Sequence, residues 1–436
     1  MLLRNSKASS NFSHRGSIKL ETPPVSTETL DQTLIAEADK CVACGLCLPH
    51  CPTYRLTLSE ADSPRGRIAM ISGVMKQHIP MNERFTLHID RCLTCRACEY
   101  VCPSKVSYGK LVDQARVKIL NASVKKTDVP YKIRSWLERQ WIDKPWRFDT
   151  LRPFVKLFQQ LGLQRLLLRL PFLNGTSFRL LLSKLPPIRY PFQHWQSFYP
   201  AVGKQRGEVG LFLGCIARLI DVETHLSTIA VLNQLGYSVH VPQQQTCCGA
   251  LYQHRGESAH SGNLLAQNQQ TFKDLNLTAL ITTASGCGAH LVENNGFSIP
   301  VMDINQFLAE QDFSQIKFNP LAKRVAVHHP CTLRHILRGS QFPSKILAYI
   351  PEIELKELAN QDQFCGAAGT YFLDQPGIAE ALLTHKIQDV LAINADYLAT
   401  SNIGCAFHIA SQLNEQQAGI EVLHPVTLLA RQMSIQ

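Results

Sequence analysis

The chain of 436 residues is long enough for two or three domains, and 45% apolar with 18% charged residues is typical of a globular protein. Its formal net charge of +10 indicates an acidic partner, a membrane surface or nucleic acid, and no apolar run reaches the roughly 18 residues of a membrane-spanning helix. The 15 cysteines occur in clusters without a secretion signal, which argues against a disulfide framework and predicts a cytoplasmic protein whose thiols bind metal.

Five segments follow one another along the sequence. Residues 1–33 are Ser-rich and predict a disordered tail. Residues 34–128 carry two dense cysteine motifs and predict a helical, two-cluster ferredoxin-like domain, and residues 129–207 form a basic connecting segment. Residues 208–320 and 321–436 alternate apolar strands with helical patterns. The expected fold class is therefore α/β, with an N-terminal all-α ferredoxin-like domain and two C-terminal cysteine-rich lobes built on parallel sheets.

The two dense motifs have the same cysteine spacing. The first, "CVACGLCLPHCP", starts at Cys41, and the second, "CLTCRACEYVCP", starts at Cys92. Both follow the C-x2-C-x2-C-x3-C-P run of bacterial ferredoxins, in which three cysteines hold one cluster and the fourth reaches the other. The spacing therefore predicts two [4Fe–4S] clusters, the first held by Cys41, Cys44, Cys47 and Cys102, and the second by Cys92, Cys95, Cys98 and Cys51.

Zinc is the alternative metal for these cysteines. Structural zinc sites usually combine two C-x2-C pairs across a spacer, and they give no reason for two identical runs that each end in C-P. The stretch between the motifs, "PRGRIAMISGVMKQ", has the periodicity of a helix. Its Arg65 and Arg67 either stabilise a negatively charged cluster or are ordinary solvated arginines.

The connecting segment is basic and rich in leucine and phenylalanine. It contains no Asp or Glu from residue 151 to residue 207, and seven basic residues lie between residues 151 and 200. Runs such as "FVKLFQQLGLQRLLLRLPFL" predict helices with one apolar and one cationic face, the pattern of helices that lie on anionic lipid. The alternatives are a linker packed on the chain's own domains and a surface docked on an acidic partner. No recognition module accompanies the charge, so nucleic acid is not expected.

The C-terminal half contains an internal repeat. Three cysteine landmarks recur after 116 to 118 residues, pairing Cys215 with Cys331, Cys248 with Cys365, and Cys287 with Cys405. Apolar runs such as "VGLFLG" and "TALITTAS" lead up to cysteines in this half, and they predict buried parallel strands. We therefore expect the thiols at the carboxyl ends of strands, which is where open α/β sheets bind ligands.

The two lobes differ in the number of thiols that they offer. The first provides a candidate third cluster with Cys215, Cys247, Cys248 and Cys287. The second has only Cys331, Cys365 and Cys405, because Phe364 stands where a paired cysteine is expected, and it is the weaker candidate for a fourth cluster. Histidines that either supply a missing ligand or only form hydrogen bonds are His328, His329 and His408, with His290 equivalent to His408 in the first lobe.

Taken together, these motifs resemble the iron–sulfur subunits of membrane-associated dehydrogenases, a group that includes heterodisulfide reductase, anaerobic glycerol-3-phosphate dehydrogenase and lactate-utilisation proteins. The resemblance is strongest to the family of glycolate oxidase iron–sulfur subunits. It runs from about residue 35 to the end of the chain and depends on "CPTYRL", "SPRGRI", "DRCLTCRACEYVCPS", "TASGCGAHL", "HPCTLRH", "CGAAGTY" and "NIGCAFH". Wider relatives complete each lobe with C-x-x-C, whereas both lobes of this chain have C-x-x-H.

The resemblance implies an electron-transfer subunit of a glycolate oxidase or dehydrogenase complex. FAD-containing subunits oxidise glycolate to glyoxylate, and the iron–sulfur subunit passes the electrons to the membrane quinone pool or another acceptor, from the cytoplasm or as a peripheral protein on the inner membrane. No catalytic residue is expected in this chain, since it has no G-x-G-x-x-G fingerprint and no P-loop. The alternatives are electron transfer from lactate, glycerol 3-phosphate or a heterodisulfide, and a zinc-stabilised binding protein.

Overall fold

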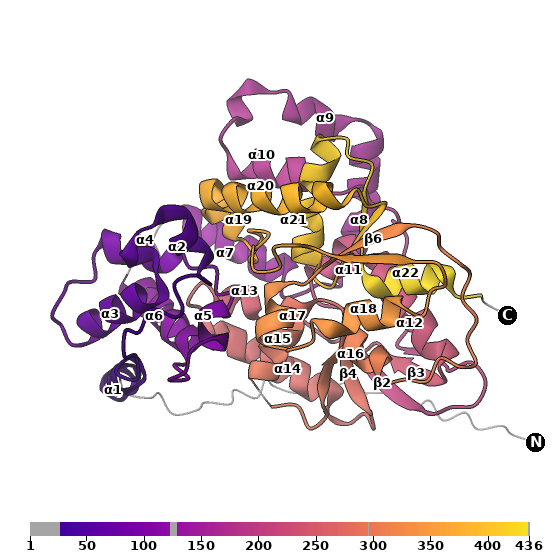
Figure 1. The fold of residues 1–436 in the computed structure, drawn as a ribbon, viewed down its shortest axis with the longest axis horizontal. Coiled ribbons are helices and arrows are strands. Elements are labelled where there is room, and N and C mark those ends of the chain that lie inside the picture. The colour runs from indigo at the N-terminus through magenta and orange to yellow at the C-terminus, as the bar shows by residue number, and fades with distance from the viewer. Residues whose placement is uncertain (1–26, 123–128, 295, 435–436) are drawn as a thin grey trace, which may run out of the picture.

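The computed structural model describes residues 27–122, 129–294 and 296–434. The helical N-terminal region lies beside a larger body made of the two lobes, and α9 and α10 project from that body (Figure 1). Most of the predicted tail, residues 1–26, lies outside the described residues. Helix α1 already begins at Thr27, so the predicted tail boundary at residue 33 falls inside this helix. None of the helices in the described ranges is both long and apolar enough to cross a membrane.

The N-terminal region consists of helices and turns over its described residues. Its core is formed by Ile71, Ile89, Leu111 and other apolar side chains, together with Cys92. Helix α3 begins where the side chain of Ser63 caps the backbone, one residue before Pro64. The elements are α1 (Thr27–Ala38), α2 (Pro52–Thr57), η1 (Glu60–Asp62), α3 (Pro64–Met75), α4 (Glu83–Asp90), α5 (Ala97–Tyr100) and α6 (Tyr108–Ala122). A specific ferredoxin-like fold for this region stays a prediction.

The connecting segment is helical and ends as part of the first lobe. Its elements are α7 (Val129–Trp141), α8 (Arg147–Gln160), α9 (Leu163–Leu168), η3 (Pro171–Leu173), α10 (Ser177–Lys184) and β1 (Phe198–Tyr199). Strand β1 pairs antiparallel with a strand of the first lobe. Asp149 of this segment binds the buried Arg152 of its own helix and Arg218 of the first lobe. The base of the segment is therefore anchored on the chain's own domains.

Each lobe is a parallel sheet covered by helices. The first contains β2 (Gly207–Phe212), α11 (Ile216–Ile220), α12 (Val222–Gln234), β3 (Tyr237–His240), α13 (Ala250–Gln253), α14 (Ser258–Lys273), β4 (Ala279–Thr282), α15 (Ser285–Glu293), β5 (Val301–Asp303) and α16 (Ile304–Ala309). The second contains β6 (Arg324–His328), α17 (Cys331–His335), α18 (Gln341–Leu347), β7 (Glu354–Glu357), α19 (Tyr371–Asp374), α20 (Pro376–Ile393), β8 (Tyr397–Thr400), α21 (Ile403–Glu415), β9 (Glu421–Leu423) and α22 (Pro425–Gln432).

The two sheets have the same topology. The strand orders are β1-β3-β2-β4-β5 and β7-β6-β8-β9, so the second lobe repeats the first apart from the added β1. All pairs other than β1 with β3 are parallel. Strand β4 is buried along its whole length, as apolar strands between two helical layers are. The predicted duplication and the parallel sheets are confirmed.

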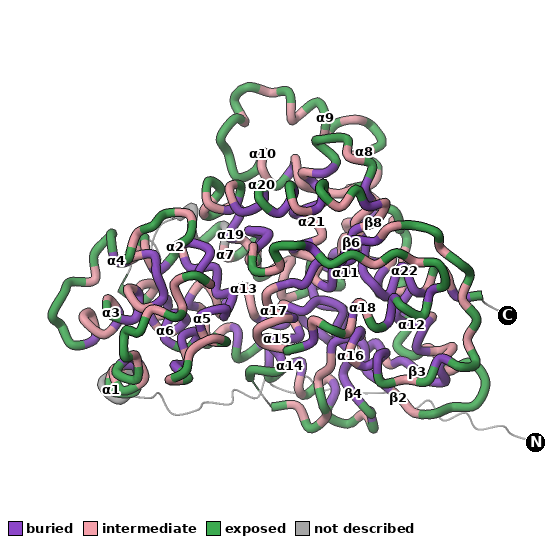
Figure 2. Tube along the Cα trace, in the orientation of Figure 1, coloured by how far each residue is buried: buried purple, intermediate pink, exposed green. Residues whose placement is uncertain are grey.

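The two lobes share a single apolar core. Residues of the first lobe, including Val209 and Ile229, lie in the same buried cluster as Val327 and Val426 of the second. Helix α12 packs against α22, and α16 packs against α18. In Figure 2 the purple, buried stretches gather in the interior of this body, and green stretches lie along its outer loops. The predicted boundary near residue 320 therefore separates two repeats of sequence that pack as one body.

Arg96 joins the N-terminal region to the first lobe. Its buried guanidinium lies within ion-pair distance of Asp113 (3.7 Å) and of Glu293 in the first lobe (3.4 Å). The side chain crosses Gly109 so closely that a Cβ added there would stand 0.4 Å from its Nη1 atom. Position 109 must therefore be glycine if Arg96 is to reach the lobe.

Candidate metal centres

The loops of the two dense motifs have positive φ angles at equivalent positions. Ala43 and Gly45 have positive φ angles of 54° and 84°, and the equivalent Thr94 and Arg96 have φ angles of 51° and 60°. Non-glycine residues seldom adopt this left-handed conformation, and it costs energy at three of these four positions. The repeated spacing thus folds into a repeated loop that turns its cysteines to one side.

The eight cysteines of these motifs line two separate cavities. One contains all four thiols predicted for the first cluster, and its cysteines are Cys41, Cys44, Cys47, Cys98 and Cys102. The other contains all four predicted for the second, and its cysteines are Cys51, Cys92, Cys95 and Cys98. The last cysteine of each motif therefore lines the cavity of the opposite motif, which is the arrangement expected for crossed ligands.

Arg65 and Arg67 each line one of the two cavities. Arg65 borders the first cavity, where it donates a hydrogen bond to the carbonyl of Ala43. Arg67 borders the second, and only 1% of its side chain is exposed. It binds Asp62, the hydroxyl of Thr53 and the carbonyl of His88. The interpretation of Arg67 as an ordinary solvated arginine is wrong, because the α3 helix turns it inward.

Other groups that contact the thiols were not found from the sequence. Tyr108 lines both cavities, and its hydroxyl donates a hydrogen bond of 3.5 Å to the Cys92 sulfur. Burial by itself raises the pKa of the Cys92 thiol, but the guanidiniums of Arg67 and Arg116 outweigh burial and leave the pKa below its usual value. The spacing of the cysteines could not indicate that Tyr108 and Arg116 contact the thiols, since both residues follow the second motif in the sequence.

The four cysteines of the first lobe come together as predicted. Cys215 follows β2, Cys247 and Cys248 follow β3, and Cys287 follows β4, so all four lie beyond the carboxyl ends of adjacent strands. The sulfurs of Cys215 and Cys247 are 3.6 Å apart. Hydrogen bonds from the thiols of Cys247 and Cys287 hold the pKa of Cys248 well below its usual value. These buried and half-buried thiols form a compact donor set.

The second lobe brings its three cysteines to the equivalent strand ends. The sulfurs of Cys365 and Cys405 are 3.0 Å apart. The side chain of Phe364, at the position of the missing cysteine, packs instead in an apolar cluster with Leu93 and Cys95 of the N-terminal region. Lys386, which has no exposed surface and donates to the carbonyl of Asn360, adds a buried cation that the sequence did not indicate.

Three of the four histidines considered as ligands have partners other than thiols. His290 lies 3.1 Å from the hydroxyl of Ser261, and His328 lies 2.8 Å from that of Thr400. His329 pairs with Glu357. Burial lowers the pKa of His408 to about 3, so this imidazole is neutral. These contacts favour the hydrogen-bonding role for the first three.

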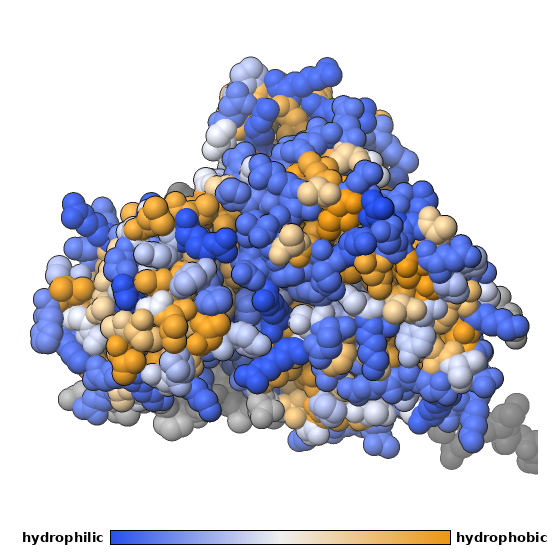
Figure 3. All heavy atoms as spheres, in the orientation of Figure 1, coloured by the Kyte–Doolittle hydropathy of each residue, from blue (hydrophilic) through white to orange (hydrophobic). Residues whose placement is uncertain are grey.

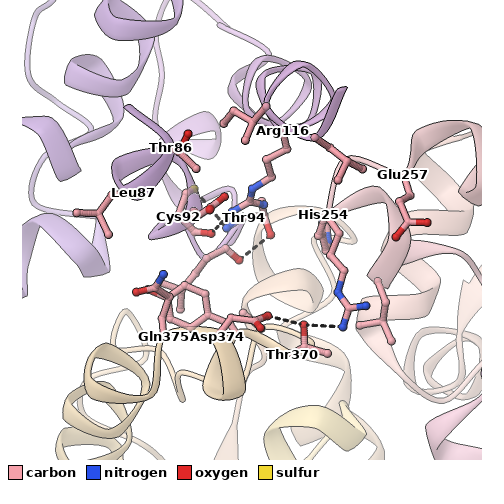
Figure 4. Close-up of a pocket in the computed structure, with 18 of the residues that line it drawn as sticks. Thr86, Leu87, Cys92, Thr94, Arg116, His254, Glu257, Thr370, Asp374 and Gln375 are labelled. Carbon is pink, nitrogen blue, oxygen red and sulfur yellow. Dashed lines mark hydrogen bonds between the residues drawn. The ribbon is translucent and has the colours of Figure 1, made fainter. Parts of the chain in front are cut away.

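A cavity of about 990 Å³ lies where the N-terminal region meets both lobes. Figure 4 shows Cys92, Thr94 and Arg116 on one side of it, and Thr370 and Asp374 of the second lobe on another. Arg116 donates to the carbonyl of Cys92, and the Thr370 hydroxyl donates to Asp374. Cys92 of the second four-thiol set therefore borders a cavity between the N-terminal region and the two lobes.

The donor chemistry of these sites fits iron–sulfur clusters. All fifteen cysteines are free thiols, and thiolate is the usual ligand of such clusters. Among the described residues, no three Cys, His, Asp or Glu side chains converge on a point that would suit one metal ion. The eight thiols of the dense motifs instead line two cavities, which suits ligands with several metal atoms.

Comparison with known proteins assigns the N-terminal region and the two lobes. The model of the 4Fe-4S dicluster domain matches residues 37–106, and that of the cysteine-rich domain matches twice, at 209–292 and 325–410. A probable glycolate oxidase iron-sulfur subunit of Bacillus subtilis is 32% identical over 84% of this chain and 86% of its own length. The glycolate oxidase iron-sulfur subunit of Escherichia coli is 30% identical, covering 88% and 94%. Lactate utilization protein A 2 of Bacillus cereus is 25% identical, covering 52% and 99%.

Proposed function

Because this chain belongs to the family of glycolate oxidase iron–sulfur subunits, we propose that it is the electron-transfer subunit of a flavin-dependent glycolate dehydrogenase complex. It relays electrons from a FAD-containing subunit to a membrane quinone or another acceptor. The observation that carries the proposal is the pair of four-thiol cavities beside two loops that share positive φ angles at equivalent positions. Substrate oxidation belongs to the flavin subunit, since this chain offers thiols for electron carriers and no flavin-binding motif.

Two [4Fe–4S] clusters are the proposed cofactors of the N-terminal region. Cys41, Cys44, Cys47 and Cys102 would hold the first, and Cys92, Cys95, Cys98 and Cys51 the second. When bound, each cluster accepts and donates one electron at a time. The protein keeps the second thiol set out of water and places the Arg67 guanidinium beside it. The positive charge of this guanidinium favours the more negative, reduced state of the cluster.

The lobes extend the proposal beyond the two N-terminal centres. The first lobe has four buried or half-buried thiols at its strand ends and is the candidate for a third cluster, held by Cys215, Cys247, Cys248 and Cys287. The second lobe remains the weaker candidate for a fourth, because Cys331, Cys365 and Cys405 provide only three thiols. This lobe nevertheless lies next to the second thiol set, since Cys331 packs in the apolar cluster that contains Cys95.

The proposed function is tested by purifying the chain anaerobically with its flavin subunit. We expect broad absorption near ~400 nm that glycolate bleaches, with roughly eight or more irons and as many sulfides per chain. Bleaching by lactate or glycerol 3-phosphate but not by glycolate would keep electron transfer and change the substrate. A colourless protein that contains zinc and no inorganic sulfide would overturn the proposal and support the zinc-stabilised alternative.

We propose that helices α8, α9 and α10 bind peripherally to the cytoplasmic face of the membrane. Exposed apolar side chains occur at helical spacing on each of them: Phe154 and Leu157 on α8, Leu163 and Leu166 on α9, and Phe178 and Leu181 on α10. Apolar patches are interleaved with hydrophilic side chains at this end of the molecule (Figure 3). Arg165 and Arg169 are exposed and Arg179 is partly exposed among them, which suits an anionic lipid surface.

Vesicles that contain anionic lipid are expected to retain the protein at low salt. Replacing Arg165, Arg169 and Arg179 together by glutamine should lower the partition coefficient on the order of 100-fold, since each basic residue near such a surface contributes about 1 kcal/mol. Flotation with phosphatidylglycerol vesicles measures this, with Leu391→Glu, at an exposed leucine of the second lobe, as the matched control. If the vesicles retain the triple variant and the unaltered protein equally, the proposal that these helices bind the membrane is wrong.

A further inference from the structure

The two four-thiol sets of the N-terminal region differ in their access to solvent. In the first set, Cys44 is exposed and Cys41, Cys47 and Cys102 are partly exposed. In the second set, all four cysteines are buried. An electron carrier held by the first set therefore lies at the protein surface, and one held by the second lies inside the molecule.

Large apolar side chains stand in solvent next to the first set. Val42 and Leu46 lie between its cysteines and are 71% and 57% exposed, and Tyr100, two residues before Cys102, is 55% exposed. Figure 3 shows apolar patches over this N-terminal region. Apolar residues that point into solvent beside a functional site are typical of contact surfaces between proteins. We name Val42, Leu46 and Tyr100 the apolar collar.

The apolar collar is held in place by the surrounding structure. Arg65 ties its loop down by donating to the carbonyl of Ala43, while its own guanidinium is fixed by Glu60. Tyr100 packs on the ring of His335 from the second lobe, with 5.6 Å between ring centroids. A partner therefore meets a preformed surface and spends little free energy on ordering it.

The second thiol set faces the rest of the chain instead. Helix α5, which carries Cys98, packs against α17 of the second lobe, and the carbonyl of Cys95 accepts a hydrogen bond from His335. Phe364 and Cys331 of the second lobe lie in the same apolar cluster as Cys95. The order from the surface inward is thus the first set, the second set and then the cysteines of the second lobe.

We propose that the apolar collar around the first thiol set is the docking surface for the FAD-containing partner subunit. The inference rests on the proposed function and names the entry point of the electrons. One electron at a time leaves the reduced flavin and enters the centre held by the first set, and the flavin protons stay with the partner or pass to water. The partner should present an apolar patch with acidic residues at its edge, because the exposed Lys105 follows Cys102 by three residues and the chain is basic overall.

The test uses the anaerobic complex with Leu46→Glu and, separately, Tyr100→Glu, one from each motif. We expect either variant to slow the reduction of the centres by glycolate and the flavin subunit by about tenfold or more, because each places a charge in an apolar contact. Iron content, inorganic sulfide, the paramagnetic signals after dithionite and the rate of reduction by dithionite should not change. Leu391→Glu, on the exposed side of α20, is the matched control and should leave both rates unchanged.

The outcomes separate the docking surface from the proposed function. Unchanged reduction by the flavin subunit in both variants, with full cluster content, would overturn the docking surface and leave the electron-transfer function standing. Absence of iron and sulfide from the unaltered protein would overturn the function itself. If Leu46→Glu alone loses iron, Tyr100→Glu decides, and a normal rate in that variant counts against the docking surface.

Discussion

Replacing Cys102 by serine is expected to abolish the same metal centre as replacing Cys44, although the two residues lie in different motifs. Cys102 and Cys44 line one cavity, and Cys51 lines the other together with Cys95. Each single substitution should remove about four irons per chain and one of two paramagnetic signals after reduction. Cys102→Ser should match Cys44→Ser, and Cys51→Ser should match Cys95→Ser. Iron analysis and low-temperature electron paramagnetic resonance of the anaerobic proteins measure the pairing.

The pairing of phenotypes is the decisive feature of this experiment. If each motif held its own cluster with all four of its cysteines, Cys51→Ser would match Cys44→Ser and Cys102→Ser would match Cys95→Ser. That result would contradict the crossed assignment and leave the presence of two clusters intact. Cys98 also lines both cavities, so its substitution distinguishes the two arrangements less well. Cys287→Ser, in the first lobe, should leave both N-terminal signals unchanged.

The sequence predicted those features of the fold that depend on short-range pattern. Parallel strands that end at cysteines could be predicted because buried strands are continuously apolar, as "TALITTAS" is around β4. The duplication could be predicted because Cys215 and Cys331 recur in register with their neighbours, and both indeed follow equivalent strands of sheets with the same order. Crossed thiol sets were predicted from the two C-P motifs; the last cysteine of each motif lines the cavity of the other, and the assignment of ligands to clusters stays a prediction.

Features that depend on long-range packing could not be predicted. Strand β1 extends the first sheet although it lies in the basic segment, because a two-residue strand has no readable periodicity. The shared core of the lobes, in which α12 packs on α22, joins residues about 200 positions apart. The burial of Arg67 could not be predicted for the same reason. Its guanidinium binds the carbonyl of His88, which belongs to α4 and not to the helix that carries Arg67.

Replacing Arg67 by glutamine is expected to lower the stability of the protein strongly. Its guanidinium is 1% exposed and pairs with Asp62, which has no exposed surface. Removing one member of a buried pair typically costs about 3–5 kcal/mol of the free energy of unfolding, although His88 and Arg91 also contact Asp62 and moderate this cost. Urea unfolding of the anaerobic protein measures the loss of stability.

The same substitution should make the reduction potential of one cluster more negative. Reduction adds a negative charge beside Arg67, so loss of the guanidinium disfavours the reduced state by about 1–2 kcal/mol, or roughly 40–90 mV for one electron. Arg65→Gln is the matched control: its side chain is 34% exposed and paired with Glu60 at the surface, so stability should change little. A redox titration should show the larger shift for Arg67→Gln, and the affected signal should be the one that Cys95→Ser abolishes. A larger shift in the signal that Cys44→Ser abolishes would mean that Arg67 serves the first thiol set, contrary to its place in the second cavity.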